Sequence, residues 1–501
     1  MGFGLKVNFA RDGFFNAQKR LVNFTTQTPT LSHMVLKHRW IQFFGLLCLL
    51  LAAPLSAAPA TTQAAGDLAR RLYEQVSPSL VAVQLTWDSE AGKQELIGTG
   101  IVIRSDGLVL CSIGLVDPRI PDEQLTDFKS IVPRDNEDDE ELPATFLGRD
   151  ERTNLAYVQT TQPQSWPAVT FSPHPIHVGD RLFSVGMLPK TEGFRTYLMQ
   201  TIAAAELRGE IPHIMVTSGL GDIGSPVFDT QGRAVGLVNI QANQSAFLNA
   251  QNIYERIGSP PMFFVPAGDF VWSFDDLPVA GIPMKLPWIG VVQMAGLNKD
   301  VAEELGLKNR PAVEIGDVIP GAPADEAGLK PGDKIVQING HPLQRGDRPE
   351  ELPSIIRRQV LRMKVGQPVT LGLYQGADQP LRQVTVTLAE QPRRSTLAKR
   401  FYAEDLGFTA REMVFYDTYL RRLPSDAKGV AVAFIKPSST AATAKLQVND
   451  IILAMNRQTV DNLEQFERDY KLFRKSNPHD PLVLVVLHEG QTQTLRLEPP
   501  Q

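Results

Sequence analysis

Apolar residues early in the chain come in short runs that turn-forming residues separate. The runs Leu80–Leu85, Gly98–Ile103 and Leu108–Leu110 are rich in Val, Ile and Leu, and Arg104–Gly107 separates the last two. Many short apolar runs with Gly and Asp turns are typical of an all-β barrel or sandwich. The pattern therefore predicts a mainly β fold from residue 79 onward.

A helical pattern precedes these runs. Within Asp67–Gln75 the side chains of Leu68, Leu72 and Tyr73 fall on one side of a helix. Apolar residues at such spacing indicate an amphipathic helix. We expect a helix here, with these three residues on one side of it.

A further β pattern occupies the stretch Gly219–Gly236. A Gly- and Pro-rich turn, Gly221–Pro226, is followed by the apolar pair Val227 and Phe228, a polar turn and a second apolar run, Ala234–Ile240. Gly, Pro and Asp punctuate the stretch as they do in a hairpin. We therefore expect a tight turn that leads into a β-hairpin.

The last third of the chain contains an imperfect repeat. Residues 321–340 and residues 437–456 follow the same outline: a short helix, Pro323–Ala327 in the first copy, then a turn and an apolar strand. Such repetition indicates a duplicated module. The second copy lacks the Pro-Gly pair that forms the turn in the first.

The head of the chain has the features of an export signal. The basic segment Lys37–Trp40 precedes the apolar run Ile41–Leu55, and the small residues Ser56–Ala58 follow. This order is that of a secretory signal peptide, and the run is shorter than the roughly 20 residues of a spanning helix. We expect export to the periplasm or cell envelope with cleavage near Ala58, and the alternative is an uncleaved anchor. Because Met34 stands where a signal peptide normally begins, we expect translation to start at Met34.

The net charge of the chain bears on whether its partner is a nucleic acid. The whole chain has a net charge of −5, but residues 1–58 carry six Lys or Arg and a single Asp, so the remainder carries −10. An acidic body without a basic stripe argues against a nucleic-acid partner. The acidic run Asp135–Glu141 lacks the alternating ligands and the Gly of a calcium loop. We expect no metal and no cofactor.

Two segments resemble the HtrA (DegP-like) family of trypsin-like serine proteases. Gly98–Leu110 looks like the opening of that family's protease domain, and where the family then has its general-base His this chain has Gly114. Gly148–Ala156 resembles the segment that carries the Asp orienting that His, and Asn154 stands in its place. The resemblance implies a two-barrel trypsin-like (chymotrypsin-fold) domain.

The turn Gly221–Pro226 resembles the nucleophile turn of the same proteases. Ile223 stands where the family has its catalytic Ser. The resemblance implies that Gly221, Asp222 and Ile223 form the oxyanion turn, in which backbone N–H groups face the substrate carbonyl.

These replacements predict that the site has no catalytic residue. Glycine cannot accept a proton, and isoleucine has no nucleophilic atom. Ser225 is the fallback nucleophile if a site has been rebuilt. None of the histidines of this domain stands at a spacing that ties it to Ser225; they are His174, His177 and His213. Cys111 is another nucleophile on paper, but it ends an apolar strand, where we expect a buried and inert thiol.

The repeated modules resemble PDZ domains, which the HtrA family carries after its protease domain. In such domains an extended peptide adds to a sheet edge, and a Gly-containing loop binds its terminal carboxylate. The resemblance places this loop at Trp288, Ile289, Gly290 and Val291 in the first copy. In the second copy it places the loop at Asp405–Phe408, with peptide-binding residues Leu406, Gly407 and Phe408.

The sequence therefore predicts a mainly β protein with a two-barrel trypsin-like domain followed by two PDZ domains. We expect a signal-containing head at 1–58, a degenerate protease domain at 68–275, and PDZ domains at 286–390 and 400–499.

Three functional hypotheses follow from this organisation. The first is an exported pseudoprotease of envelope protein quality control that binds unfolded or C-terminal protein segments, as chaperone, adaptor or regulator of an active relative. The resemblance also implies a trimer-based homo-oligomer. The alternatives are an active serine endopeptidase that uses Ser225, and an envelope scaffold with one fixed protein partner.

Overall fold

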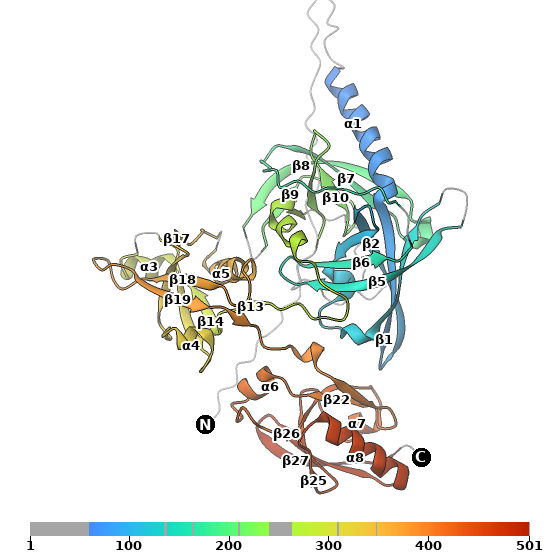
Figure 1. Ribbon diagram of the computed structural model, residues 1–501, viewed down its shortest axis with the longest axis vertical. Helices are drawn as coiled ribbons and strands as arrows, with labels where there is room; N and C mark the ends of the chain where they lie inside the picture. Colours follow the sequence, from blue (N-terminus) through green and yellow to red (C-terminus); the bar gives the residue numbers. More distant parts are fainter. Residues whose placement is uncertain are drawn as a thin grey trace, which may run out of the picture. The chain divides into compact units, whose positions relative to one another are not determined.

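A computed structural model gives the architecture, and it describes residues 60–134, 138–162, 165–208, 211–239, 263–307, 310–346 and 348–499 (Figure 1). The predicted export signal at residues 37–58 lies outside these ranges. In the described part of the chain, no helix has the length and apolar character that crossing a membrane requires.

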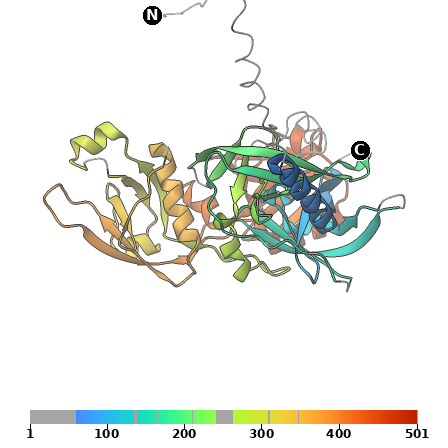
Figure 2. The same cartoon turned by 90° about the horizontal axis from the view of Figure 1, so that it is seen from above.

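The described part of the chain begins with helix α1 (Ala60–Val76), drawn in blue in Figures 1 and 2. The helix is longer than the sequence pattern predicted. Leu72 and Val76 are buried in the core of the barrels, whereas Tyr73 is 38% exposed. The Tyr73 hydroxyl donates to the carbonyl of Thr196 at 3.3 Å.

Twelve strands then form two closed barrels, which confirms the predicted two-barrel fold. The first barrel has the order β1-β2-β3-β6-β5-β4 and the second β10-β11-β12-β9-β8-β7. Closure pairs every strand on both sides, so that neither sheet has a free edge. The first barrel consists of β1 (Leu80–Ser89), β2 (Gly92–Arg104), β3 (Leu108–Ser112), β4 (Leu125–Val132), β5 (Glu140–Asp150) and β6 (Leu155–Thr160). The second consists of β7 (Arg181–Met187), β8 (Thr196–Leu207), β9 (His213–Val216), β10 (Pro226–Phe228), β11 (Ala234–Leu237) and β12 (Phe263–Pro266).

The two barrels share a hydrophobic core. One cluster of buried side chains includes Ile101 and Leu110 of the first barrel together with Phe183 and Phe228 of the second. Burial of apolar surface on this scale is the main favourable term in folding. The shared core therefore fixes the two barrels against each other. The candidate site lies at the boundary between them.

The first repeated module is a sheet with the order β14-β15-β16-β18-β19, to which β17 adds beside β16. Helix α5 has its apolar side in the core through residues such as Ile355 and Ile356. A separate two-stranded sheet pairs β13 with β20. The elements are β13 (Pro287–Trp288), β14 (Val291–Gly296), α3 (Lys299–Glu304), β15 (Val313–Val318), α4 (Pro323–Glu326), β16 (Lys334–Ile338), β17 (His341–Pro342), α5 (Leu352–Leu361), β18 (Pro368–Leu373), β19 (Arg382–Thr387) and β20 (Ala389–Glu390).

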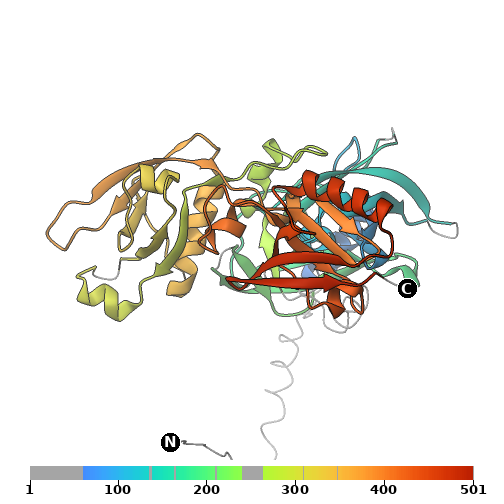
Figure 3. The same ribbon diagram turned by 90° about the horizontal axis from the view of Figure 1, so that it is seen from below.

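The second module repeats this order but has one more strand at the edge, β21-β22-β23-β24-β26-β27. Figure 3 shows its red helix α8 lying over the orange and red strands of the module. The elements are β21 (Arg400–Ala403), β22 (Phe408–Glu412), α6 (Phe415–Tyr419), β23 (Val430–Ile435), α7 (Thr440–Thr443), β24 (Ile451–Met455), β25 (Gln458–Thr459), α8 (Leu463–Ser476), β26 (Leu482–His488) and β27 (Gln491–Leu497).

A buried ion pair stabilises the second module. Arg411 donates two hydrogen bonds to the carboxylate of Asp417, at 2.6 and 2.8 Å, and both side chains are almost fully buried. Burial raises the pKa of Asp417, but the bonds from Arg411 and from the Val414 N–H outweigh this effect and hold that pKa below its usual value. The carboxylate is therefore charged and depends on its partner.

We expect Arg411→Met to destabilise the second module by about 3 kcal/mol, because the buried carboxylate loses both hydrogen bonds from Arg411 and keeps only the longer ion pair with Arg421 at 3.5 Å. Denaturant unfolding, followed by far-UV circular dichroism, measures the loss. Arg468→Met is the matched control, since Arg468 pairs with Asp469 at the surface and such pairs contribute about 0–1 kcal/mol. Equal unfolding midpoints for the two variants would contradict the prediction.

Candidate functional site

The three positions where a catalytic triad is expected lie at strand ends and turns of the barrels. Gly114 is buried in a short 3-10 helix (Ile113–Val116) directly after β3. Asn154 is buried in the turn between β5 and β6, with a left-handed φ of 57°, a conformation that Asn tolerates better than most residues. Ile223 lies half-buried in the turn that precedes β10.

A polar network joins the barrels at these positions. Ser112 Oγ donates to Asn239 Oδ1 at 2.6 Å, and Asn239 Nδ2 donates to the Asn154 carbonyl at 2.9 Å. The same carbonyl accepts from the Ile113 N–H at 3.0 Å, and Ser112 Oγ accepts from the Gly114 N–H at 3.3 Å. Since Asn239 follows β11 of the second barrel, the network brings Gly114 and Asn154 together at the boundary between the barrels.

Sequence reasoning did not single out Ser112 or Asn239. Both are buried polar residues that directly follow or end an apolar strand run. A buried polar side chain needs a hydrogen-bond partner, so this position after an apolar strand is the signal that could have found them.

The turn that carries Ile223 is packed closely against the first barrel. Gly224 has a φ of +103°, and a Cβ built on it would lie 2.2 Å from the Thr99 carbonyl oxygen of β2. The Gly224 N–H donates to the Val238 carbonyl at 2.8 Å. Because Val238 precedes Asn239, these contacts place Ile223 beside the polar network.

The carboxylate of Asp222 is the acceptor on which the turn depends. It accepts from Ser225 Oγ at 2.7 Å, from the Met187 N–H at 2.9 Å and from the Thr99 hydroxyl. Burial raises the pKa of Asp222, and these hydrogen bonds partly offset that rise. Ser225 itself is 0% exposed, so its hydroxyl points into the protein and toward Asp222.

One of the two expected oxyanion donors already has a partner inside the protein. In trypsin-like proteases the hole uses the N–H groups of the nucleophile and of the residue two before it, which are Ile223 and Gly221 here. The Gly221 N–H donates to Ser184 Oγ at 3.1 Å, and this hydroxyl donates in turn to the Pro226 carbonyl at 3.0 Å. Ser184 is fully buried in β7.

The remaining candidate residues of this domain lie in different surroundings. His174 and His177 are exposed. His213 is buried at the start of β9, with Nδ1 2.7 Å from the Ile211 carbonyl, and burial lowers its pKa. Cys111 is fully buried in β3, and burial raises the pKa of its thiol to about 12, which suppresses the nucleophilic thiolate.

The two expected carboxylate-binding loops are built alike. In the first module Trp288 belongs to β13, Ile289 and Gly290 form the turn, and Val291 begins β14. The Ile289 carbonyl accepts from the Ala324 N–H at 2.8 Å, and the Gly290 carbonyl from the Ile319 N–H at 3.1 Å.

The second module uses equivalent bonds. The Leu406 carbonyl accepts from the Ala441 N–H at 3.0 Å, and the Gly407 carbonyl from the Lys436 N–H at 2.8 Å. Phe408 begins β22. In both loops the two carbonyls therefore accept from the short helix that follows and from the segment that leads into that helix.

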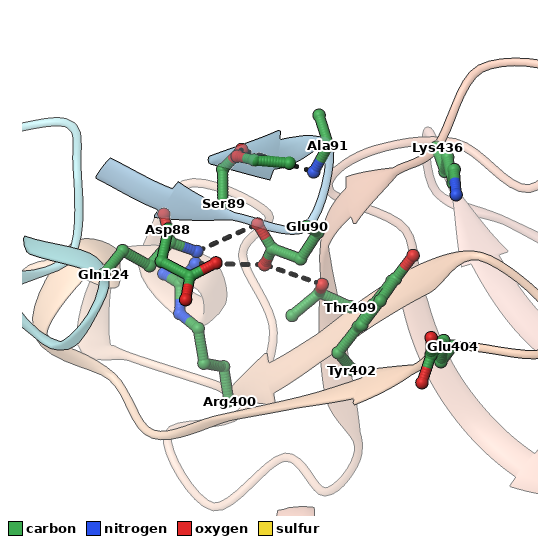
Figure 4. A pocket seen from close by; sticks show the side chains of 11 residues that line it. Asp88, Ser89, Glu90, Ala91, Gln124, Arg400, Tyr402, Glu404, Thr409 and Lys436 are labelled. Atoms are coloured by element: carbon green, nitrogen blue, oxygen red, sulfur yellow. Dashed lines mark hydrogen bonds and ion pairs between the residues drawn. The ribbon is translucent and has the colours of Figure 1, made fainter. Parts of the chain in front are cut away.

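A polar pocket lies between the β1–β2 hairpin and strands β21 and β22 (Figure 4). Glu90 accepts from the Thr409 hydroxyl at 2.8 Å and forms an ion pair with Arg400 at 3.8 Å. Arg400 also pairs with Glu123 at 3.3 Å. Within the described ranges, no cluster of His, Cys, Asp and Glu has the composition of a metal site.

Comparison with known proteins agrees with this architecture. A family model for trypsin-like peptidase domains matches residues 98–237, and two models for PDZ domains match residues 314–365 and 406–498. A probable periplasmic DegP-like serine endoprotease of Hahella chejuensis is 26% identical over 410 residues, which is 78% of each chain. The chain is a DegP/HtrA homologue. It contains a trypsin-like peptidase domain and two PDZ domains, as the sequence predicted.

Other homologues carry the same description. A probable periplasmic DegP-like serine endoprotease of Brucella suis is 27% identical over 373 residues, 72% of this chain and 66% of the relative. Among solved structures, the HtrA-type protease AlgW with a tripeptide matches 65% of this DegP homologue and 98% of that chain, with 18% identity and a TM-score of 0.48.

Gly224→Ala is expected to destabilise the barrels by about 2–4 kcal/mol, because the new Cβ would meet the Thr99 carbonyl and the positive φ disfavours a side chain. Thermal unfolding measures this loss. Gly232→Ala is the control: its φ is +79°, and the nearest atom to a new Cβ lies 3.8 Å away, so only the backbone cost of about 1–2 kcal/mol applies. A smaller loss for Gly224→Ala than for the control would refute the packing argument.

His213 predicts a pH dependence of stability. Its pKa is lower in the folded protein than the ordinary value of 6.5, so the unfolded chain binds more protons between those two values. Stability therefore falls as the pH drops from 7 toward 5. We expect His213→Gln to flatten this part of the curve, measured as the free energy of unfolding against pH in the variant and in the unaltered chain. An unaltered slope in His213→Gln would count against the assignment.

Proposed function

We propose that this DegP homologue is an exported pseudoprotease that binds unfolded or C-terminal protein segments in the periplasm. It acts as a chaperone, an adaptor or a regulator of an active relative in protein quality control. The names of its homologues support the periplasmic location and the protease ancestry.

One observation carries the loss of proteolysis. The network at the boundary of the barrels consists of Ser112, Asn239 and the backbone of Asn154, and it encloses Gly114. None of these groups is a base that could take a proton from a nucleophile at neutral pH.

The turn supports the same conclusion in two further ways. Ile223 offers no nucleophilic atom, and the Gly221 N–H is bonded to Ser184 rather than free for a substrate. Ser225 is buried with its hydroxyl bonded to Asp222. A substrate carbonyl therefore has no route to the Ser225 oxygen without rearrangement of the turn.

Peptide binding rests on the first PDZ module. Strand β14 is the last strand on its side of the sheet, and an edge strand presents unpaired N–H and C=O groups to an extended chain. This is the arrangement through which a peptide adds to a PDZ sheet.

The test uses the chain from Pro59 onward with a fluorophosphonate probe and, separately, a reduced and unfolded protein. We expect no labelling, no cleavage and suppression of aggregation of the unfolded protein. Loss of nucleophile or base costs about 10⁶ in turnover in another serine protease, so the absence of activity is measurable against any active relative.

Two variants sharpen the test. Ile223→Ser alone is expected to remain unlabelled, because it restores a hydroxyl without a base. Labelling of the unaltered chain that Ser225→Ala abolishes would show a rebuilt serine endopeptidase and would overturn the pseudoprotease proposal.

A further inference from the structure

The two PDZ modules differ in the strand that precedes the carboxylate-binding loop. In the first module that strand, β13, turns away and pairs with β20 through Pro287–Glu390 and Trp288–Ala389. In the second module the corresponding strand, β21, pairs directly with β22. The strand that should receive a ligand therefore already has a neighbour in the second module.

Strand β21 runs in the direction of a bound peptide. It is antiparallel to β22, with Phe401 opposite Ala410 and Ala403 opposite Phe408, and its C-terminal end reaches the loop. A peptide that adds to a PDZ sheet likewise ends with its carboxylate at this loop.

The loop N–H groups bind the end of β21. The Ala403 carbonyl accepts from the Gly407 N–H at 2.8 Å and from the Leu406 N–H at 3.2 Å. The carbonyls of these two residues bond to the opposite side, as they do in the first module. The Ala403 oxygen thus occupies the place that a ligand carboxylate would take.

Side chains of β21 also fill the groove next to helix α8. Phe401 makes edge contacts with Phe466, at 6.2 Å between ring centroids, and with Tyr470, at 5.4 Å. Ala403, two residues later and hence on the same face of the strand, is 1% exposed. The two residues fill the positions of alternate side chains of a ligand.

The loop is further tied to α8. Asp405 accepts from the Tyr470 hydroxyl and forms an ion pair with Arg474 at 2.9 Å. These contacts hold the loop, the helix and the inserted strand together.

We propose that β21 is an internal ligand of the second PDZ module, and that it closes this groove so that C-terminal peptides bind the first module only. The proposal deepens the proposed function, since it assigns peptide binding to one of the two modules. When most molecules are closed, the apparent affinity for an external peptide is the intrinsic affinity multiplied by the small fraction of molecules that are open.

The test compares Phe401→Ala with Tyr402→Ala in the full chain. Tyr402 lies on the opposite face of β21 and lines the polar pocket of Figure 4, so its loss leaves the groove filled. The probe is a five-residue peptide with the sequence of residues 399–403 and a free C-terminal carboxylate. Hydrogen exchange locates its binding, and titration gives its affinity.

We expect Phe401→Ala to exchange faster at residues 400–403 and to bind the probe at β22 and α8 about tenfold more tightly than the unaltered chain or Tyr402→Ala. Unchanged exchange at β24 and β26 shows that the module stays folded. Phe401→Asp is the second variant, and it opens the groove further by placing a carboxylate against the aromatic rings.

Three outcomes would overturn the proposal. In the first, the unaltered chain binds the probe at β22 as tightly as Phe401→Ala does. In the second, β21 exchanges faster in Phe401→Ala but the probe does not bind at β22, and in the third, β21 stays protected from exchange in both Phe401 variants. Failure of the proposed function gives a different result, because it appears as absent peptide protection at β14 and α5 whatever happens at β22.

Discussion

Backbone N–H groups that lie away from water need an acceptor, and an N–H group that bonds inside the protein is unavailable to a ligand. Two turns of this protein depend on this constraint. The Gly221 N–H bonds to Ser184 in the protease-like turn, and the Leu406 and Gly407 N–H groups bond to Ala403 in the second PDZ loop. In both places the frame of a binding site is present, but one of its two expected donors in the turn and both named donors in the loop bond inside the protein.

The protease-like turn is held together by contacts that do not involve the side chain at the nucleophile position. Asp222 gathers three donors from β2, from the end of β7 and from the turn itself, and Gly224 lies against β2. Removal of a buried acceptor would leave several donors unpaired, at about 1–3 kcal/mol each. The hydrogen bonds of Asp222 and the packing of Gly224 therefore fix the shape of the turn, and neither involves the side chain of Ile223.

Several parts of this architecture could be predicted from the sequence. Runs of apolar residues with Gly and Asp turns predicted the barrel strands, and the hairpin expected after the turn Gly221–Pro226 is the pair β10 and β11. These features are local, because turn residues and strand propensity act over a few neighbours. The buried partners Ser112, Asn239 and Ser184 were not predicted, since each acts on a residue far away in the sequence.

The sequence by itself determined which chemical groups stand at Gly114, Asn154 and Ile223, because the identity of a side chain sets whether it can take a proton or attack a carbonyl. It also determined that two similar modules follow the barrels. Only the tertiary structure decided which backbone donors stay available in each module. Strands β13 and β21 precede equivalent loops, yet one pairs with β20 and the other with β22. The β21–β22 pair closes over the short loop at residues 404–407, whereas β13 pairs with a strand at the far end of its module. The packing of segments distant in the sequence therefore decides the partner of β13, and no local pattern encodes it.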